Sequence, residues 1–369
     1  MRILLISGIV FVHVPSDPQT SPFLGLNGFF DWLRVFLGDS LFRIGVPCLS
    51  AISGYLLFQR GWDAFDYRKT LRSKARTILL PFLLWNGGLL VAVLLIQRFG
   101  IGVGYFPDLW NASTREFLSY ALATEGLPVD IPLYFLRDLI VCIILSPVLA
   151  ILVRRFPAVT LGVLFVLAIL PGVMIGIVLK KSILFSFTFG IFLALNKLDL
   201  KALDRFSIAG TAATLIAAIL LGVGLYRTGP DFPWALDLAR SALSIVGAGG
   251  FWLMSAFVIR SWLGQRLAAT GSLSFWIFCA HYPLLVLMWM MWNRVGDPDQ
   301  YPLFYVTAVV ASFIILPVTN LFVSRAMPGF YEILTGSRGR KAKLAAAAKS
   351  YSSAGFSSPA EPTMTQQRR

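Results

Sequence analysis

Two histidines are the residues of this chain whose type and spacing best suit proton-transfer chemistry. Arg2 and His13 bracket a mostly apolar stretch. Eleven helical steps make about three turns plus 20°, so both side chains fall on one helix face about 16 Å apart. This places a charge near one membrane surface and an imidazole near the bilayer middle, where ionisable groups are costly and usually functional. An imidazole also exchanges its proton near neutral pH.

The second histidine, His281, also lies inside an apolar run, about 17 Å from the cytoplasmic side by rise per residue, which matches the depth of His13. Two polar groups at one depth are least costly if their helices adjoin, so we expect the first and ninth spans to share a polar cavity. Two other interpretations remain: His13 as a structural, hydrogen-bonded histidine, and the first stretch as a signal peptide. No small-x-small cleavage site follows, and the later apolar spans do not suit a secreted protein.

A basic segment provides the other candidate site. Arg68, Arg72 and Arg76 recur at i, i+4 and i+8 and therefore share one helix face. They are either a positive-inside anchor or a binding site for an anionic cofactor, because arginine offers paired donors to phosphate.

Composition defines the class of protein that must position these residues. Hydrophobic residues make up 57% of the 369 residues and charged residues only 14%, with a mean hydropathy of +0.74. Soluble domains carry about a quarter charged residues, so the chain is expected to be a polytopic membrane protein. The three cysteines lie in apolar segments and indicate no disulfide framework. No phosphate-binding loop, dinucleotide motif or metal-ligand cluster is present in the sequence, and the net charge of +14 indicates topology rather than nucleic acid.

Ten apolar runs predict an all-α fold with about ten transmembrane helices. They lie near residues 1–14, 40–58, 78–98, 132–153, 158–178, 181–196, 207–226, 236–258, 269–292 and 302–324. The Lys/Arg bias of the connecting segments places both termini in the cytoplasm, and Lys180-Lys181 is the one basic pair on the outer side. Residues 1–330 are expected to form the membrane domain and residues 331–369 a disordered basic tail.

Several local features carry further expectations. The first run spans only about 21 Å against a membrane core of about 30 Å. Either this helix stops within the membrane beside a cavity or the true start lies upstream of Met1, and the upstream start is favoured. Residues 29–37 predict an interfacial helix or an extension of the second span.

Ser53 and Gly54 permit close approach of a backbone or a substrate, with ordinary helix packing as the plainer interpretation. Arg137 and Asp138 are adjacent opposite charges that need partners, and spans five to eight are expected to be scaffold.

Five short motifs, in order along the chain, resemble the acyltransferase 3 family of integral-membrane O-acyltransferases. An Arg-x10-His in the first helix is matched by Arg2 and His13, and a basic stretch before a proline by Arg72, Arg76 and Pro81. The other three are matched by Val46, Pro47, Ser53, Gly54 and Tyr55; by Phe135, Leu136, Arg137 and Leu139, with Tyr134 in place of a tryptophan; and by Ser274, Phe275, Ile277, His281 and Pro283. The departure at Tyr134 puts the packing or acceptor contact of that motif in doubt.

The resemblance implies transfer of an acetyl or succinyl group from acyl-CoA to a sugar hydroxyl of a lipid-linked or exported polysaccharide, in the bacterial inner membrane. Within the family, the chain is most similar to members that modify rhizobial exopolysaccharides such as succinoglycan. His13 is the expected general base, and His281 or Arg137 the donor to the thioester oxygen. Arg2, Arg72 and Arg76, with Arg68, are expected to hold the CoA phosphates. A covalent acyl-histidine stays an open alternative to direct transfer.

Two other classes of function are compatible with parts of this pattern. A polysaccharide or lipid-linked sugar transporter could use the membrane histidines as a proton relay, although membrane carboxylate pairs and an inverted repeat are not evident in the sequence. A structural subunit of an export complex would need neither histidine. The sequence indicates no resident cofactor and no metal, and the expected partners are acyl-CoA, the glycan acceptor and membrane lipid.

Overall fold

The protein is an all-helical bundle in the computed structural model, which describes residues 2–262 and 271–336; within these ranges there is no β-strand. The helices are α1 (Arg2–Val12), α2 (Phe29–Val35), α3 (Gly45–Phe58), α4 (Tyr67–Lys74), α5 (Leu80–Gln97), α6 (Thr114–Leu122), α7 (Tyr134–Arg155), α8 (Pro157–Ile169), α9 (Lys181–Leu195), α10 (Ser207–Thr228), α11 (Trp234–Val258), α13 (Gly271–Val295), α14 (Tyr301–Ala326) and α15 (Pro328–Thr335).

A helix lies on every one of the ten predicted apolar runs, so the predicted all-α class is confirmed. Six helical segments of the described chain are long and apolar enough to cross a membrane by themselves: Phe29–Phe58, Tyr67–Gln97, Ile131–Arg155, Leu200–Thr228, Leu273–Val295 and Pro298–Ala326. Shorter apolar helices cover Arg2–Val12, Pro157–Ile169 and Lys181–Leu195. The total of ten spans and the sidedness of the termini therefore stay predictions.

Residues 29–37 extend the second span. After α2 the chain continues through a π-helical stretch, Phe36–Leu41, and a 3₁₀ turn, Phe42–Ile44, directly into α3. A second π-helical stretch, Ala75–Leu79, joins α4 to α5 in the same way. Because π turns change the direction of side chains along a helix, they often occur at functional sites. The second stretch lines one of the cavities described below through Arg76 and Thr77, and the first ends directly before Phe42, which lines the other.

The fifth predicted span is wrong at its end. The apolar run 158–178 is helical only to Ile169, and residues 170–180 form a loop before α9 begins at Lys181. Pro171 disfavours the helical conformation of the residue before it, and Leu170 accordingly has φ −64° and ψ 120°. Gly172 then takes a left-handed φ of 74°. Hydropathy alone cannot show such a break, because the loop residues are as apolar as the helix.

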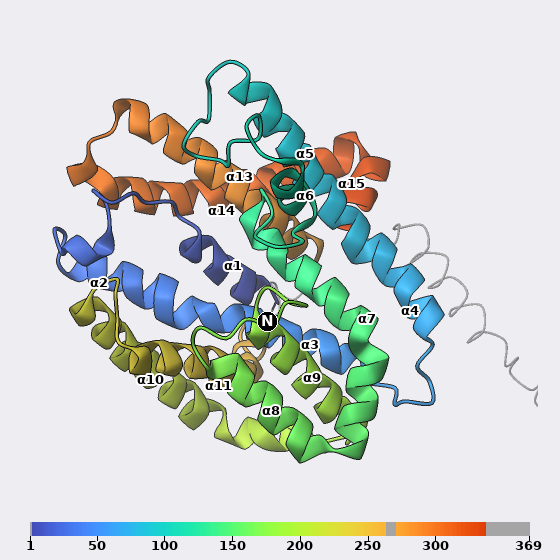
Figure 1. Cartoon of the computed structure of the whole chain (residues 1–369). Helices are drawn as coiled ribbons and strands as arrows, with labels where there is room; N and C mark the ends of the chain where they lie inside the picture. Colours follow the sequence, from blue (N-terminus) through green and yellow to red (C-terminus); the bar gives the residue numbers. More distant parts are fainter. Residues whose placement is uncertain (1, 263–270, 337–369) are drawn as a thin grey trace, which may run out of the picture.

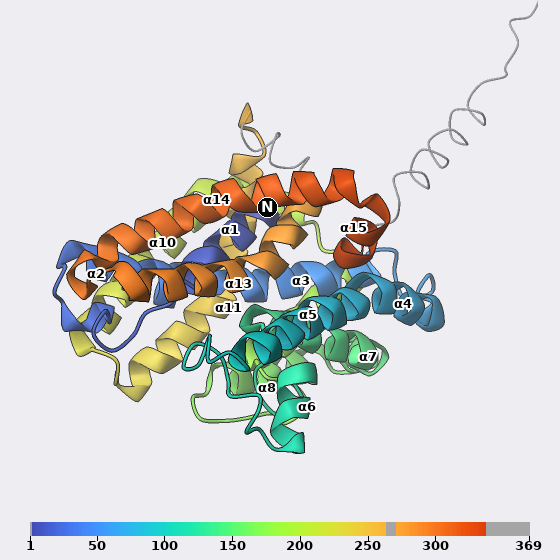
Figure 2. The same cartoon turned by 90° about the horizontal axis from the view of Figure 1, so that it is seen from above.

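The predicted domain boundary after residue 330 falls inside α15, so ordered helix continues to Thr335. The rest of the predicted tail, residues 337–369, lies outside the described residues. Figure 1 shows α4 and α15 at one end of the bundle and α2 at the other, and Figure 2 shows the same separation from above. Helix α1 is packed inside the bundle against α3 and α13, which puts the first histidine in the protein interior.

Gly54 serves helix packing. Its α-carbon faces α9, where an added Cβ would collide with the carbonyl oxygen of Phe187. Gly190 of α9 meets α3 in the same way, at the carbonyl oxygen of Ala51. The neighbouring Ser53 donates its hydroxyl to Leu49 O at 2.8 Å, within its own helix. The plainer interpretation of these small residues holds, because small side chains let two backbones approach closely.

Candidate active site

The two histidines meet in the interior, as the sequence predicted. Nε2 of His281 lies 3.4 Å from Nδ1 of His13, and the ring centroids are 5.2 Å apart. His13 follows the last residue of α1, and Pro15 ends any further helix there. His281 lies in the middle of α13 and is fully buried. The predicted contact between the first and ninth spans is therefore confirmed, whereas the polar cavity beside His13 is lined by α1 and not by α13.

Hydrogen-bond partners assign the tautomers of both rings. Nδ1 of His281 lies 2.8 Å from Phe278 O and 3.0 Å from Ile277 O, so this nitrogen must carry the proton. Nδ1 of His13 likewise donates to Ile9 O at 2.9 Å and lies beside the unprotonated Nε2 of His281. In the neutral pair, the Nε2 lone pair of His13 is therefore available as a base.

His13 borders a cavity of about 660 Å³, which we call the histidine cavity. Its wall is built by the end of α1, the start of α3, α7 and α11, and the loop before α9. The chemically active side chains on this wall are His13, Arg43, Tyr134, Lys180, Lys181, Asp237 and Arg240. His281 does not line this cavity and lies directly behind His13. A substrate in the cavity would therefore meet the ring of His13 and not that of His281.

A second, larger cavity of about 1180 Å³ lies at the other end of the bundle and is called here the arginine cavity. Arg68, Arg72 and Arg76, the face predicted from their spacing, all line it together with Lys69 and Glu332. Its opposite wall is α15, which is fixed to α5 by a hydrogen bond from Trp85 Nε1 to Leu334 O at 3.1 Å. Four cations against one carboxylate make this cavity suited to polyanions.

Arg2 does not share the arginine cavity. Its side chain is exposed at the start of α1, and it is not among the lining residues. The predicted grouping of Arg2 with Arg72 and Arg76 is therefore not seen in this structure.

Arg137 holds a loop instead of facing the reaction centre. Its guanidinium donates to Ile177 O at 2.7 Å and pairs with Asp138 at 2.9 Å. The fully buried Asp138 carboxylate also accepts the backbone N–H groups of Leu179 and Lys180, at 2.9 and 2.8 Å. Three of these contacts, to Ile177, Leu179 and Lys180, fix the loop before α9 against α7. Arg137 does not line the histidine cavity, so the structure does not support it as the donor to the thioester oxygen.

Three functional candidates were missed by sequence reasoning: Arg43, Lys180 and Arg240. All three line the histidine cavity, and two of them, Lys180 and Arg240, lie in the region of spans five to eight, which were expected to be scaffold. The available signal was Lys180-Lys181, the one basic pair on the outer side. Tyr134, which the motif comparison singled out, lines the same cavity, and the Lys180 ammonium lies 5.8 Å from the centre of its ring.

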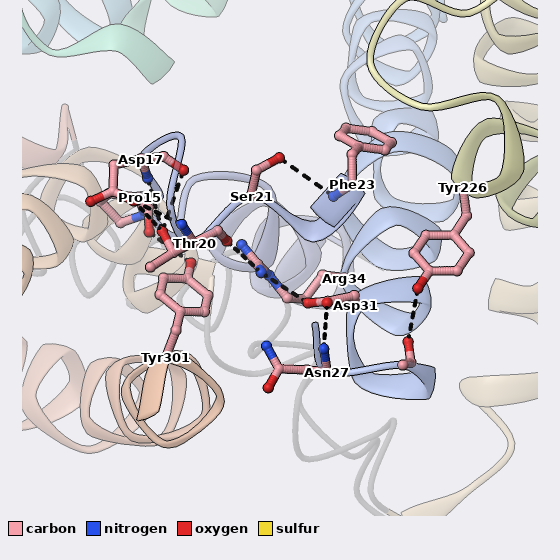
Figure 3. A network of polar contacts seen from close by, with 11 residues as sticks. Pro15, Asp17, Thr20, Ser21, Phe23, Asn27, Asp31, Arg34, Tyr226 and Tyr301 are labelled. Carbon is pink, nitrogen blue, oxygen red and sulfur yellow. Dashed lines mark hydrogen bonds and ion pairs between the residues drawn. The ribbon is translucent and has the colours of Figure 1, made fainter. Parts of the chain in front are cut away.

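A polar network holds the segment that leaves His13 (Figure 3). Tyr301 donates its hydroxyl to Pro15 O at 2.7 Å, two residues beyond the histidine. Arg34 lies over the Tyr301 ring at 4.1 Å, donates to Thr20 O at 2.8 Å and pairs with Asp31 at 3.3 Å. Because Arg34 and Asp31 are both buried, this network anchors the connection between α1 and α2 firmly.

The helical membrane fold, the histidine pair and the two cavities define a multi-pass membrane enzyme, and comparisons with known proteins identify its class. Residues 1–318 match the family described as Acyltransferase domain, and the chain belongs to that family. It is an acyltransferase of the bacterial inner membrane. The chain is 56% identical over 357 residues to the "Succinoglycan biosynthesis protein ExoH" of Rhizobium meliloti (strain 1021), covering 97% of this chain and 96% of that protein. No solved structure matches it.

Proposed function

We propose that the protein transfers an acetyl or succinyl group from acyl-CoA to a sugar hydroxyl of an exopolysaccharide or another cell-surface glycan. The observation that carries this proposal is the His13 ring, which lines a cavity and whose Nδ1 is occupied by Ile9 O. Its remaining nitrogen is a base in a partly enclosed site. Family membership supports acyl transfer, and the similarity to a succinoglycan biosynthesis protein supports a polysaccharide acceptor, either lipid-linked or exported.

The two cavities suit the two substrates. Arginine binds phosphate through paired, charge-assisted hydrogen bonds, and the arginine cavity offers Arg68, Arg72 and Arg76 together. We assign this end to the cytoplasm, where acyl-CoA is available, because the Lys/Arg bias places the same loops inside. With ten spans, both termini then lie in the cytoplasm. The histidine cavity faces the opposite side, where the glycan would enter beside membrane lipid.

The reaction we propose uses His13 as a general base. The acceptor hydroxyl oxygen bonds to the thioester carbonyl carbon while its proton passes to Nε2 of His13. The tetrahedral intermediate then collapses by breaking the carbon–sulfur bond, and His13 returns the proton to the departing CoA thiolate. A hydroxyl is a weak nucleophile at neutral pH, so removal of its proton during attack lowers the barrier.

His281 acts on this reaction through His13. Its Nδ1 proton is held by Ile277 O and Phe278 O, so in the neutral ring no proton is left for the thioester oxygen. Its Nε2 lone pair lies 3.4 Å from Nδ1 of His13, as a second acceptor beside Ile9 O, and stabilises the imidazolium that forms during proton transfer. We therefore assign His281 as a positioning residue, which replaces the sequence-based expectation of an oxyanion donor.

The experiment is a transfer assay in membranes that contain the full-length protein. Radiolabelled acetyl-CoA and succinyl-CoA are supplied separately, with de-acylated polysaccharide or its lipid-linked precursor as the acceptor. We expect base-labile label in the glycan with the native protein and none above background with His13→Ala. A transporter would move the glycan across the membrane and leave it unlabelled, and that result would reject the proposal.

A further inference from the structure

The histidine cavity carries more positive charge than its own carboxylates neutralise. Arg43 pairs with Asp39 at 2.7 Å, and Arg240 pairs with Asp237 at 2.7 Å and approaches Asp39 at 3.7 Å. Lys180 and Lys181 add two further cations to the same wall. Four cations are therefore balanced by two carboxylates, Asp237 on the wall and Asp39 beside it. Because cavities in a membrane protein desolvate charges, such an excess indicates an anionic ligand.

Lys180 is the cation of this group that is best placed to bind such a ligand. Its ammonium lies beside the Tyr134 ring and makes no ion pair among residues 2–262 and 271–336. The Lys181 ammonium, in contrast, donates to Leu170 O. The Lys180 backbone is held by the buried Asp138, so the position of this side chain is set by the fold and not by a free loop.

The position of His13 indicates which part of a substrate reaches these cations. In the proposed reaction CoA enters from the arginine cavity, and its thioester carbonyl must lie beside Nε2 of His13. The acyl chain beyond that carbonyl then extends into the histidine cavity, whose wall holds Arg43, Lys180 and Arg240. An acetyl group ends at its methyl, whereas a dicarboxylic acyl group such as succinyl carries a carboxylate at the far end of a short carbon chain.

We propose that Lys180, together with Arg43 and Arg240, binds the distal carboxylate of a dicarboxylic acyl group and so selects a succinyl-type donor over acetyl. This inference rests on the proposed acyl transfer. A carboxylate that leaves water needs charged hydrogen-bond partners, and the cations supply them. A neutral acyl group such as acetyl offers these cations no anionic hydrogen-bond acceptor, so its donor binds less tightly.

The first test compares the two donors in the membrane transfer assay. We expect Lys180→Met to lower the ratio of succinyl to acetyl transfer by about tenfold or more, mainly through the KM for succinyl-CoA. Lys180→Arg should restore most of the ratio, and Lys180→Glu should lower it further by repulsion. Lys201→Met, an exposed lysine outside both cavities, is the matched control and should keep the native ratio.

An equal loss with both donors would overturn the inference, because the cations would then bind an anionic group of the acceptor, such as a lipid phosphate or an acidic sugar. An unchanged ratio would overturn it as well. In both cases acyl transfer itself would stand, so this failure is distinguishable from failure of the proposed function, in which the native protein transfers neither group.

The second test needs no turnover. Monomethyl succinate carries the ester and the free carboxylate of the proposed ligand, whereas dimethyl succinate lacks the charge. We expect the monoester, and not the diester, to raise the Tm of the detergent-solubilised native protein, because binding to the folded state stabilises it. Lys180→Met should lose this shift and Lys201→Met should keep it. Equal shifts with both esters, or no shift with either, would count against a carboxylate site.

Discussion

His281 Nε2 lies 3.4 Å from His13 Nδ1, although 268 positions separate the two residues in the chain. The rings meet edge to face at 66°, and each Nδ1 is directed at carbonyl oxygens of its own helix. The contact therefore joins the end of α1 to the middle of α13 in one unit with a defined tautomer. It leaves one basic nitrogen on the ring that lines the cavity.

Replacement of His13 by alanine should remove activity without removing the protein. General base catalysis contributes about 10²–10⁴ in rate, so we expect kcat to fall by at least about a hundredfold. Insertion and acyl-CoA binding should persist, because α1 keeps its buried apolar contacts and the arginine cavity is untouched. Single-turnover rates in membranes measure the loss of activity, and quantified immunoblots of the same membranes measure how much protein is inserted. Native rates in a well-expressed variant would exclude His13 as the base.

A double-mutant cycle should show that the histidines act as one unit. His281→Ala should lower kcat, and the double His→Ala variant should lose little more than His13→Ala alone, since a positioning residue has no effect once its target is gone. Each variant is compared at equal protein level in the transfer assay. Losses that multiply would mean that His281 contributes independently of His13.

Neutralising the arginine cavity should weaken donor binding. Each charge-assisted hydrogen bond is worth about 1.5–3 kcal/mol, so Arg72→Ala with Arg76→Ala should raise the KM for acyl-CoA by about a hundredfold or more. Higher salt should weaken the native affinity in the same direction, because these side chains are exposed. Arg155→Ala, an exposed arginine outside the cavity, serves as the control. An unchanged KM would leave these arginines as topology anchors only.

Asp138→Asn should destabilise the fold around the loop before α9. The buried carboxylate accepts from Arg137 and from two backbone N–H groups, and loss of its charge leaves the guanidinium poorly compensated. Breaking one partner of a buried pair costs about 3–5 kcal/mol, and the amide retains part of the hydrogen bonding, so we expect about 2–3 kcal/mol. Thermal unfolding in detergent measures the loss. An unchanged Tm would show that Asp138 does not hold the loop.

Gly54→Ala should lower the stability of the protein by disturbing the packing of α3 against α9. The added Cβ would meet the carbonyl oxygen of Phe187, a backbone atom that cannot rotate away. Overpacking of this kind costs about 1–3 kcal/mol. Gly87→Ala is the matched control, since an added Cβ there meets no atom within 4 Å, and we expect a small gain because alanine favours helix. Equal behaviour of the two variants in thermal unfolding would reject close helix packing at Gly54.

The sequence by itself determined the helices and which residues share a face. Apolar runs long enough for a membrane leave the backbone little choice but helix, and helical spacing then brings Arg68, Arg72 and Arg76 to one side. Equal depth in two apolar runs was sufficient to predict that His13 and His281 meet, because polar groups in a membrane are least costly together.

Only the tertiary structure decided what surrounds the histidines. The end of α8 depends on Pro171 and Gly172, and the loop that follows brings Lys180 to the cavity. Arg43 reaches the same cavity from the 3₁₀ turn before α3, and Arg240 reaches it from α11. Arg137 was separated from the reaction centre by its contacts with Asp138 and Ile177. Periodicity describes one helix at a time, whereas these positions depend on how several helices pack, and close packing is set by contacts between residues distant in the chain.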